Sequence, residues 1–66
     1  MTTLLDIGSS IQAARKANGL TQEQLADLAG ISERTLRSIE GGSGNPSFKA
    51  VLSAAEVLGI RLSVEQ

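Results

Sequence analysis

Residues 21–40, TQEQLADLAGISERTLRSIE, have the pattern of two short helices joined by a tight turn. Thr21 is typical of a helix N-cap, because its hydroxyl can accept a backbone N–H of the first turn, and Gln24 completes a capping-box pattern. Gly30 favours the left-handed backbone conformation that ends a helix, and Ser32 is placed to cap a second helix almost at once. The chain must therefore turn sharply between the two helices.

Apolar side chains recur at helical spacing in both helices and indicate which faces point inward. The side chains expected inside are Leu25, Leu28 and Ala29 in the first helix, Ile31 at the corner, and Leu36 and Ile39 in the second. Gly41 and Gly42 are expected to end the second helix. Two helices at so short a turn predict a helix-turn-helix, in which the second helix is offered to the DNA major groove.

Two further helices are predicted on either side of this pair. Thr3 and Asp6 suggest a cap for a helix that runs to about Ala17, and Ser47 is placed to cap another that ends at Gly59. The apolar stripe of the first comprises Leu4, Ile7, Ile11 and Ala14, and that of the last comprises Phe48, Val51, Leu52, Ala55 and Leu58. Small residues around Gly8 weaken the first helix locally and allow close packing.

The run LTQEQLA at 20–26, followed by GIS at 30–32, TL at 35–36 and IEG at 39–41, resembles the Xre, or lambda-repressor-like, helix-turn-helix family. The resemblance extends from the first helix through the helix after Pro46. It implies an all-α, four- to five-helix lambda-repressor-like domain, and residues 1–66 are expected to form this single DNA-binding domain. The alternative is a helical hairpin in some other small bundle.

The resemblance also implies roles for particular residues. The expected DNA-binding residues are Thr21, Gln22, Ser32, Glu33, Arg34, Thr35, Arg37, Ser38, Ser43 and Asn45. Glu33, Arg34 and Ser38 match positions that reach base edges, and their chemistry fits: Arg donates to guanine, Glu accepts from cytosine and Ser can do either. Gln22 matches a residue that contacts phosphate and braces the recognition helix. The alternative for each is an ordinary solvated side chain.

Glu40 ends the second helix of the pair, where the helix dipole disfavours an acidic side chain. In the Xre family an acid at this place pairs with an arginine of the first helix, and Arg15 matches that arginine. We therefore expect a structural ion pair between Arg15 and Glu40.

Composition limits the remaining possibilities. Six Lys and Arg against seven Asp and Glu give a net charge of −1, whereas many DNA-binding domains are basic. The basic residues Arg15, Lys16, Arg34, Arg37 and Lys49 lie centrally in the chain, so an acidic total can hide a locally basic face.

The chain has no cysteine or histidine, so we expect no disulfide, no metal and no cofactor. A domain of 66 residues is marginal alone, which favours an oligomer.

Glycines recur in the segment from Gly41 to Ser47, but a helix precedes it rather than the strand that nucleotide-binding loops require. We interpret it as a connector whose backbone N–H groups meet DNA phosphate. The chain also lacks a signal-peptide pattern and any apolar run of membrane-spanning length. We expect a cytoplasmic protein, bacterial or phage in origin and associated with the nucleoid, with no membrane partner.

The spacing of apolar residues changes in residues 60–65 from the helical period to strict alternation. Ile60, Leu62 and Val64 alternate with Arg61, Ser63 and Glu65, which is the pattern of a short C-terminal β-strand. Four helices followed by such a strand resemble the HipB-type antitoxins, which dimerise through it and bind a toxin kinase of the HipA type. The resemblance thus implies a homodimer with a small intermolecular sheet.

The predicted function is a sequence-specific transcriptional repressor that binds double-stranded operator DNA and autoregulates its operon as the antitoxin of a HipA-type pair. The alternative is an interaction module that neutralises a partner toxin with little DNA role. An enzyme is rejected, because the sequence offers no histidine, cysteine or clustered carboxylate pair for catalysis.

The pairing register of the predicted strand can be tested by crosslinking. If the two-fold axis passes through Ser63, Leu62 meets Val64 of the partner subunit and Arg61 meets Glu65 of the partner subunit, so apolar and charged residues keep separate faces. We expect a Ser63→Cys variant to form a disulfide-linked dimer under mild oxidation. Crosslinking of Leu62→Cys but not Ser63→Cys would place the axis one residue earlier.

Overall fold

The computed structural model describes residues 3–60 and contains four α-helices: α1 (Leu4–Ala17), α2 (Gln22–Ala29), α3 (Glu33–Gly41) and α4 (Phe48–Val57). Within these residues the protein is all-helical, as predicted. The predicted β-strand lies almost entirely outside the described residues. Ile60, its first residue, is in no regular element, is half-buried against the core, and donates its N–H to the Ala55 carbonyl at 2.9 Å.

The predicted N-caps are confirmed, while α4 ends at Val57, two residues before the predicted Gly59. Thr3 and Thr21 each form a capping box, with Asp6 and Gln24 respectively, and Ser32 and Ser47 cap α3 and α4. Each cap satisfies backbone N–H groups that a helix start leaves unpaired. Gly30 closes α2 with φ of 70°, a left-handed conformation in which a side chain would be strained.

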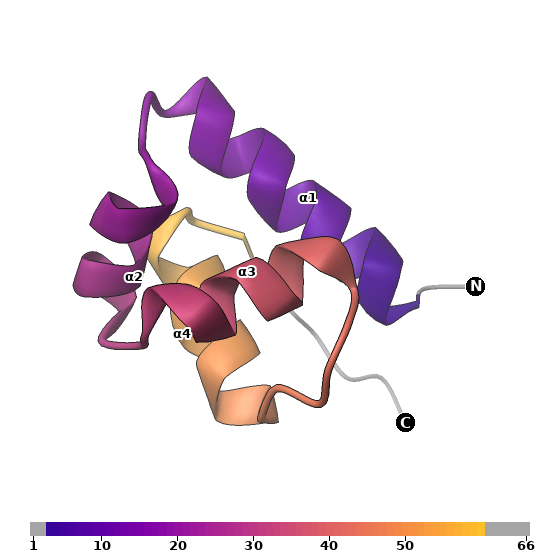
Figure 1. The fold of residues 1–66 in the computed structure, drawn as a ribbon. Helices are drawn as coiled ribbons and strands as arrows, with labels where there is room; N and C mark the ends of the chain where they lie inside the picture. The colour runs from indigo at the N-terminus through magenta and orange to yellow at the C-terminus, as the bar shows by residue number, and fades with distance from the viewer. Residues whose placement is uncertain (1–2, 61–66) are drawn as a thin grey trace.

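The helices pack in two pairs around one core. α1 lies across α3, and α2 packs against α4, while α2 and α3 meet at the tight turn (Figure 1). Four large side chains at the centre are fully buried: Ile11, Leu25, Leu36 and Ile39. Because Leu36 and Ile39 both lie on α3, the core fixes the position and the rotation of that helix.

The prediction of an inward-facing side chain is wrong at two residues. Leu28 is 63% exposed and Phe48 is 61% exposed. A helix turns roughly 100° per residue, which puts Leu28 about 105° from the centre of the inward arc formed by the buried Leu25 and Ala26 and the half-buried Ala29. Phe48 opens α4 and lies about 90° from the centre of its buried face by the same measure.

The buried face of α4 is built largely from alanine. Ala50, Ala54 and Ala55 are buried there with Val51, so α4 approaches the core closely.

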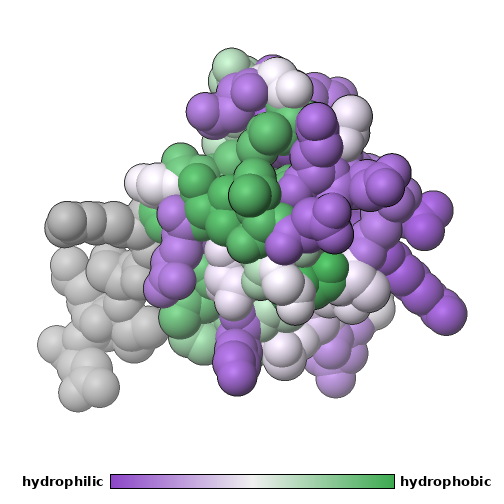
Figure 2. All heavy atoms as spheres, turned by 90° about the vertical axis from the view of Figure 1, so that its left-hand side faces the viewer, coloured by the Kyte–Doolittle hydropathy of each residue, from purple (hydrophilic) through white to green (hydrophobic). Residues whose placement is uncertain are grey.

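Leu28 does not reach this core and instead borders an open hollow of about 310 Å³, which it lines with Leu20, Gln24 and Asp27. Figure 2, which looks onto the α2 side, shows apolar side chains gathered there and bordered by polar ones. None of the four described helices is long and apolar enough to cross a membrane.

At Gly8 the helix α1 lies directly against the backbone of α3. A Cβ built at Gly8 would overlap the carbonyl oxygen of Ile39 and come within 3.1 Å of the Glu40 oxygen. Both obstacles are backbone atoms, so they cannot rotate away. The close packing predicted from the small residues of α1 is therefore present, and it depends on the absence of a side chain at this residue.

We expect Gly8→Ala to destabilise the fold by about 1–3 kcal/mol, the usual cost of overpacking, although alanine favours helix by about 1 kcal/mol. Gly41→Ala is the matched control, because its Cβ would meet only the Ser43 hydroxyl at 3.7 Å. Thermal unfolding of both variants checks this. A Gly8→Ala protein as stable as Gly41→Ala would contradict the described crossing of α1 and α3.

Candidate nucleic-acid interface

The end of α3 is tied to α1 by a buried ion pair between Arg15 and Glu40, which are 8% and 5% exposed. Arg15 Nε donates to Glu40 Oε2 at 2.7 Å, and Arg15 Nη2 donates to Glu40 Oε1 at 3.0 Å. This two-point contact is the strong form of a guanidinium–carboxylate bond. Hydrogen bonding to Glu40 raises the pKa of Arg15 above its ordinary value, against the lowering effect of burial.

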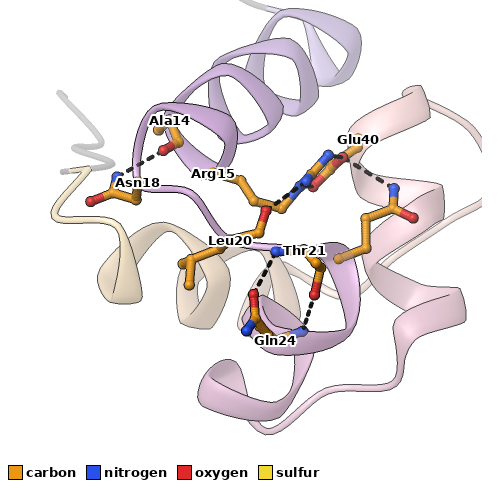
Figure 3. A network of polar contacts seen from close by, with 8 residues as sticks. Ala14, Arg15, Asn18, Leu20, Thr21, Gln24 and Glu40 are labelled. Atoms are coloured by element: carbon orange, nitrogen blue, oxygen red, sulfur yellow. Dashed lines mark hydrogen bonds and ion pairs between the residues drawn. The ribbon is translucent and has the colours of Figure 1, made fainter.

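Arg15 also holds the corner between α1 and α2. Its Nη1 donates to the Leu20 carbonyl at 2.9 Å, so one guanidinium contacts both α3 and the segment that leads into α2 (Figure 3). Sequence reasoning missed the Leu20 carbonyl as an acceptor. A backbone oxygen carries no residue-type signal, and only the path of the turn places it there.

Gln22, the first residue of α2, is half-buried beside this pair. Its Nε2 donates to Glu40 Oε1 at 3.2 Å, so α2 and α3 are joined by a side-chain contact near their exposed edge. Thr21 precedes it as the N-cap, and its hydroxyl accepts the Gln24 N–H at 3.0 Å. Among the described residues, no buried side-chain nitrogen or oxygen is left without a hydrogen-bond partner.

The outer face of α3 is polar. Glu33, Arg34 and Arg37 are exposed, while Thr35 and Ser38 are half-buried. Ser32 donates its hydroxyl to Thr35 Oγ1 at 2.8 Å and accepts the Thr35 N–H at 3.0 Å. The Ser32 hydroxyl therefore caps α3 and is bonded to the Thr35 hydroxyl, whereas Glu33, Arg34 and Arg37 are exposed.

A second feature of this face is an open hollow of about 200 Å³ between α3 and the segment that leads to α4. Its lining residues are Arg34, Thr35, Ser38, Asn45 and Pro46. The structure thus brings three of the predicted DNA-binding residues of α3 together with Asn45. Pro46 was not among the predicted site residues, because nothing in its side chain indicates binding chemistry.

Ser43 differs from expectation in one respect. Its side chain is exposed, but its backbone N–H donates to the Ser38 carbonyl at 3.0 Å. The Gly42 N–H likewise donates to Ile39 at 3.2 Å. These two N–H groups extend the end of α3 and are not available to a phosphate, so the connector offers fewer backbone donors than its glycine content suggests.

A capped, core-anchored α3 with a polar outer face, set against α2 at a tight turn, defines a helix-turn-helix DNA-binding domain. The chain belongs to the HTH_3 family, described as helix-turn-helix, whose family model matches residues 11–64. This family is a class of DNA-binding regulators and not a class of enzymes.

Similar proteins include the immunity repressor protein of Bacillus phage phi105, which is 41% identical over 59 residues. The match covers 89% of this chain and 41% of the repressor, so the chain spans less than half the length of that relative. SinR, a master regulator for biofilm formation whose structure was solved in complex with DNA, shares 34% sequence identity with this chain. The two structures superpose with a TM-score of 0.71 over 83% of this chain and 89% of the SinR chain. A chain of the HipA-HipB-O2-O3 complex has a TM-score of 0.84 at 20% identity, covering 100% and 93%, and shares the fold.

We expect Glu40→Ala to lower the melting temperature far more than Glu56→Ala, which changes an exposed acid on α4. Removing one partner of a buried ion pair costs about 3–5 kcal/mol, because the other charge is left uncompensated. Surface substitutions usually stay within about 0.5 kcal/mol. Calorimetry of the two variants gives the comparison, and equal melting temperatures would reject a stabilising role for Glu40.

Proposed function

We propose that this chain is a sequence-specific transcriptional repressor that regulates its own operon. The observation that carries the proposal is the division of α3 into a buried face and an exposed one. Leu36 and Ile39 are fully buried, and Glu33, Arg34 and Arg37 are exposed. A helix held rigidly by its inner face can present side chains to the major groove in a fixed register.

In this proposal α3 reads the bases and the start of α2 contacts the backbone. Arg34 donates two hydrogen bonds to guanine, Glu33 accepts from cytosine, and Ser38 supplies a hydroxyl to either kind of base. Gln22 donates to phosphate, and Thr21, Ser32, Thr35, Arg37, Ser43 and Asn45 complete the contact surface. Repression follows from occupation of the promoter, in the cytoplasm where the operator lies. The phi105 immunity repressor and DNA-bound SinR support this reading.

The repressor acts as a homodimer in this proposal. Residues 60–65 alternate in the manner of a strand, and antiparallel pairing of two copies supplies a second recognition helix. The operator is then an inverted repeat whose half-sites lie about one helical turn, roughly 34 Å, apart. A net charge of −1 supports this arrangement, because one protomer has little electrostatic attraction for DNA.

The second candidate function is that of an antitoxin that also binds a HipA-type toxin kinase. The alternation in residues 60–65 favours it, and the shared fold with the HipA-HipB-O2-O3 structure is consistent with it. DNA titrations with and without the product of a neighbouring gene distinguish the two roles. A repressor alone binds DNA equally well in both, and a repressor that is also the antitoxin binds both DNA and the gene product. A protein whose main act is to neutralise a toxin binds the gene product and shows little affinity for DNA.

We expect Arg34→Ala to lose about 1–3 kcal/mol on a duplex selected by the wild-type chain from a random pool, and to relax preference at one base position. Selection repeated with the variant measures both effects. A uniform loss on all sequences, with the salt slope reduced by about 1, would instead make Arg34 a phosphate contact. Lys16→Ala is the control, since it removes an exposed cation of α1 that lies outside the proposed contact surface.

A further inference from the structure

The buried pair of Arg15 and Glu40 also holds a third side chain. Glu40 Oε1 accepts from Arg15 Nη2 at 3.0 Å and from Gln22 Nε2 at 3.2 Å. Gln22 is the first residue of α2, at the helix end whose unpaired N–H groups and dipole favour an anion. The Gln22 amide is therefore anchored to the core pair at the place where α2 is suited to meet a phosphate.

The side-chain amide of Gln22 has one N–H donor still available. A glutamine NH₂ group carries two N–H donors, and the Glu40 bond uses one of them. Among residues 3–60, Nε2 has no other hydrogen-bond partner. Glu40 is 5% exposed whereas Gln22 is only half-buried, so the acceptor lies in the core and the amide lies at the surface.

The charge of the acceptor is compatible with DNA nearby. A lone carboxylate at this edge would repel phosphate, but Arg15 bonds both oxygens of Glu40 and cancels its charge. Glu40 can therefore orient the amide of Gln22 without presenting a net negative charge to the duplex.

We propose that Glu40 is a positioning residue for DNA binding: held by Arg15, it fixes the Gln22 amide so that the second N–H donates to a backbone phosphate. The inference rests on the proposed DNA-binding function and adds a link from the core ion pair to one phosphate contact. Glutamine has large rotamer freedom, so fixing the side chain before binding removes part of the entropy cost of the contact.

Three variants separate positioning from folding. Gln22→Met removes the donor and keeps the side-chain length. The double variant Arg15→Met with Glu40→Met removes both charges together, which avoids an uncompensated buried charge and is often neutral for stability. Gln12→Met is the control, because Gln12 is a half-buried amide on α1 with no side-chain hydrogen bond to a described residue. The probe is a duplex that the wild-type chain selects from a random pool, made also with single methylphosphonate replacements.

One phosphate is expected to identify the contact. Its replacement should weaken wild-type and Gln12→Met binding about ten- to hundredfold, the range for a hydrogen bond to a charged group, and leave Gln22→Met unaffected. The Arg15→Met, Glu40→Met protein should lose sensitivity at this same phosphate, while its base preference and its response at other phosphates stay as in wild type. A role confined to stability would not remove the response at one phosphate alone.

The results that would overturn the proposal can be told apart from failure of the proposed function. Full sensitivity of the double variant at the Gln22 phosphate would show that Glu40 does not position the amide, while DNA binding itself stands. Failure of the wild-type chain to select any sequence would overturn the proposed function and this inference together. If the double variant does not fold, NMR of wild-type Gln22 decides: one side-chain rotamer, unchanged between free and bound protein, supports the proposal, and rotamer averaging in the free protein overturns it.

Discussion

The carboxylate of Glu40 is the constraint on which the arrangement of the first three helices depends. It lies at the C-terminal end of α3, where the helix dipole opposes it, and it is 5% exposed, so it must be compensated. Arg15 supplies two hydrogen bonds to it and a third to Leu20. The guanidinium is planar and rigid. All of these hydrogen bonds therefore form only when the end of α1, the α1–α2 corner and the end of α3 lie in one relative placement.

The ion pair determines placement more than it supplies stability. A buried pair costs much of its Coulomb energy in desolvation, so the driving force for folding comes from the apolar core. The helices pack closely around that core only because the side chains at their contacts are small. Gly8 leaves room for the backbone carbonyls of α3, and Ala50, Ala54 and Ala55 let α4 pack close to the core. Close backbone approach in turn brings Arg15 within reach of Glu40, so packing and ion pair require each other.

Local chemistry in the sequence predicted the helix ends and the turn, because a cap and a left-handed glycine act over three or four residues. Periodicity predicted the core less well. Leu28 and Phe48 fit an apolar stripe but are exposed, since the neighbours of a helix, and not its own hydrophobic residues, decide which arc is buried. The Arg15–Glu40 pair followed from family resemblance. The resemblance also implied that Gln22 braces this helix, but neither its acceptor, Glu40, nor the hollow beside Asn45 could be predicted, because both join segments whose relative position only the folded chain sets.

The charge distribution then limits how such a surface can bind DNA. Arg15 and Glu40 cancel inside, which leaves Arg34 and Arg37 against Glu33 as the exposed charges of α3. So small an excess of positive charge releases few counterions, and counterion release supplies most non-specific affinity. In the proposed complex, a neutral donor such as Gln22 contributes only when a phosphate lies at hydrogen-bond distance in the correct direction. A surface built this way gains affinity from geometry more than from charge, so its selectivity depends on how rigidly the core holds α2 and α3.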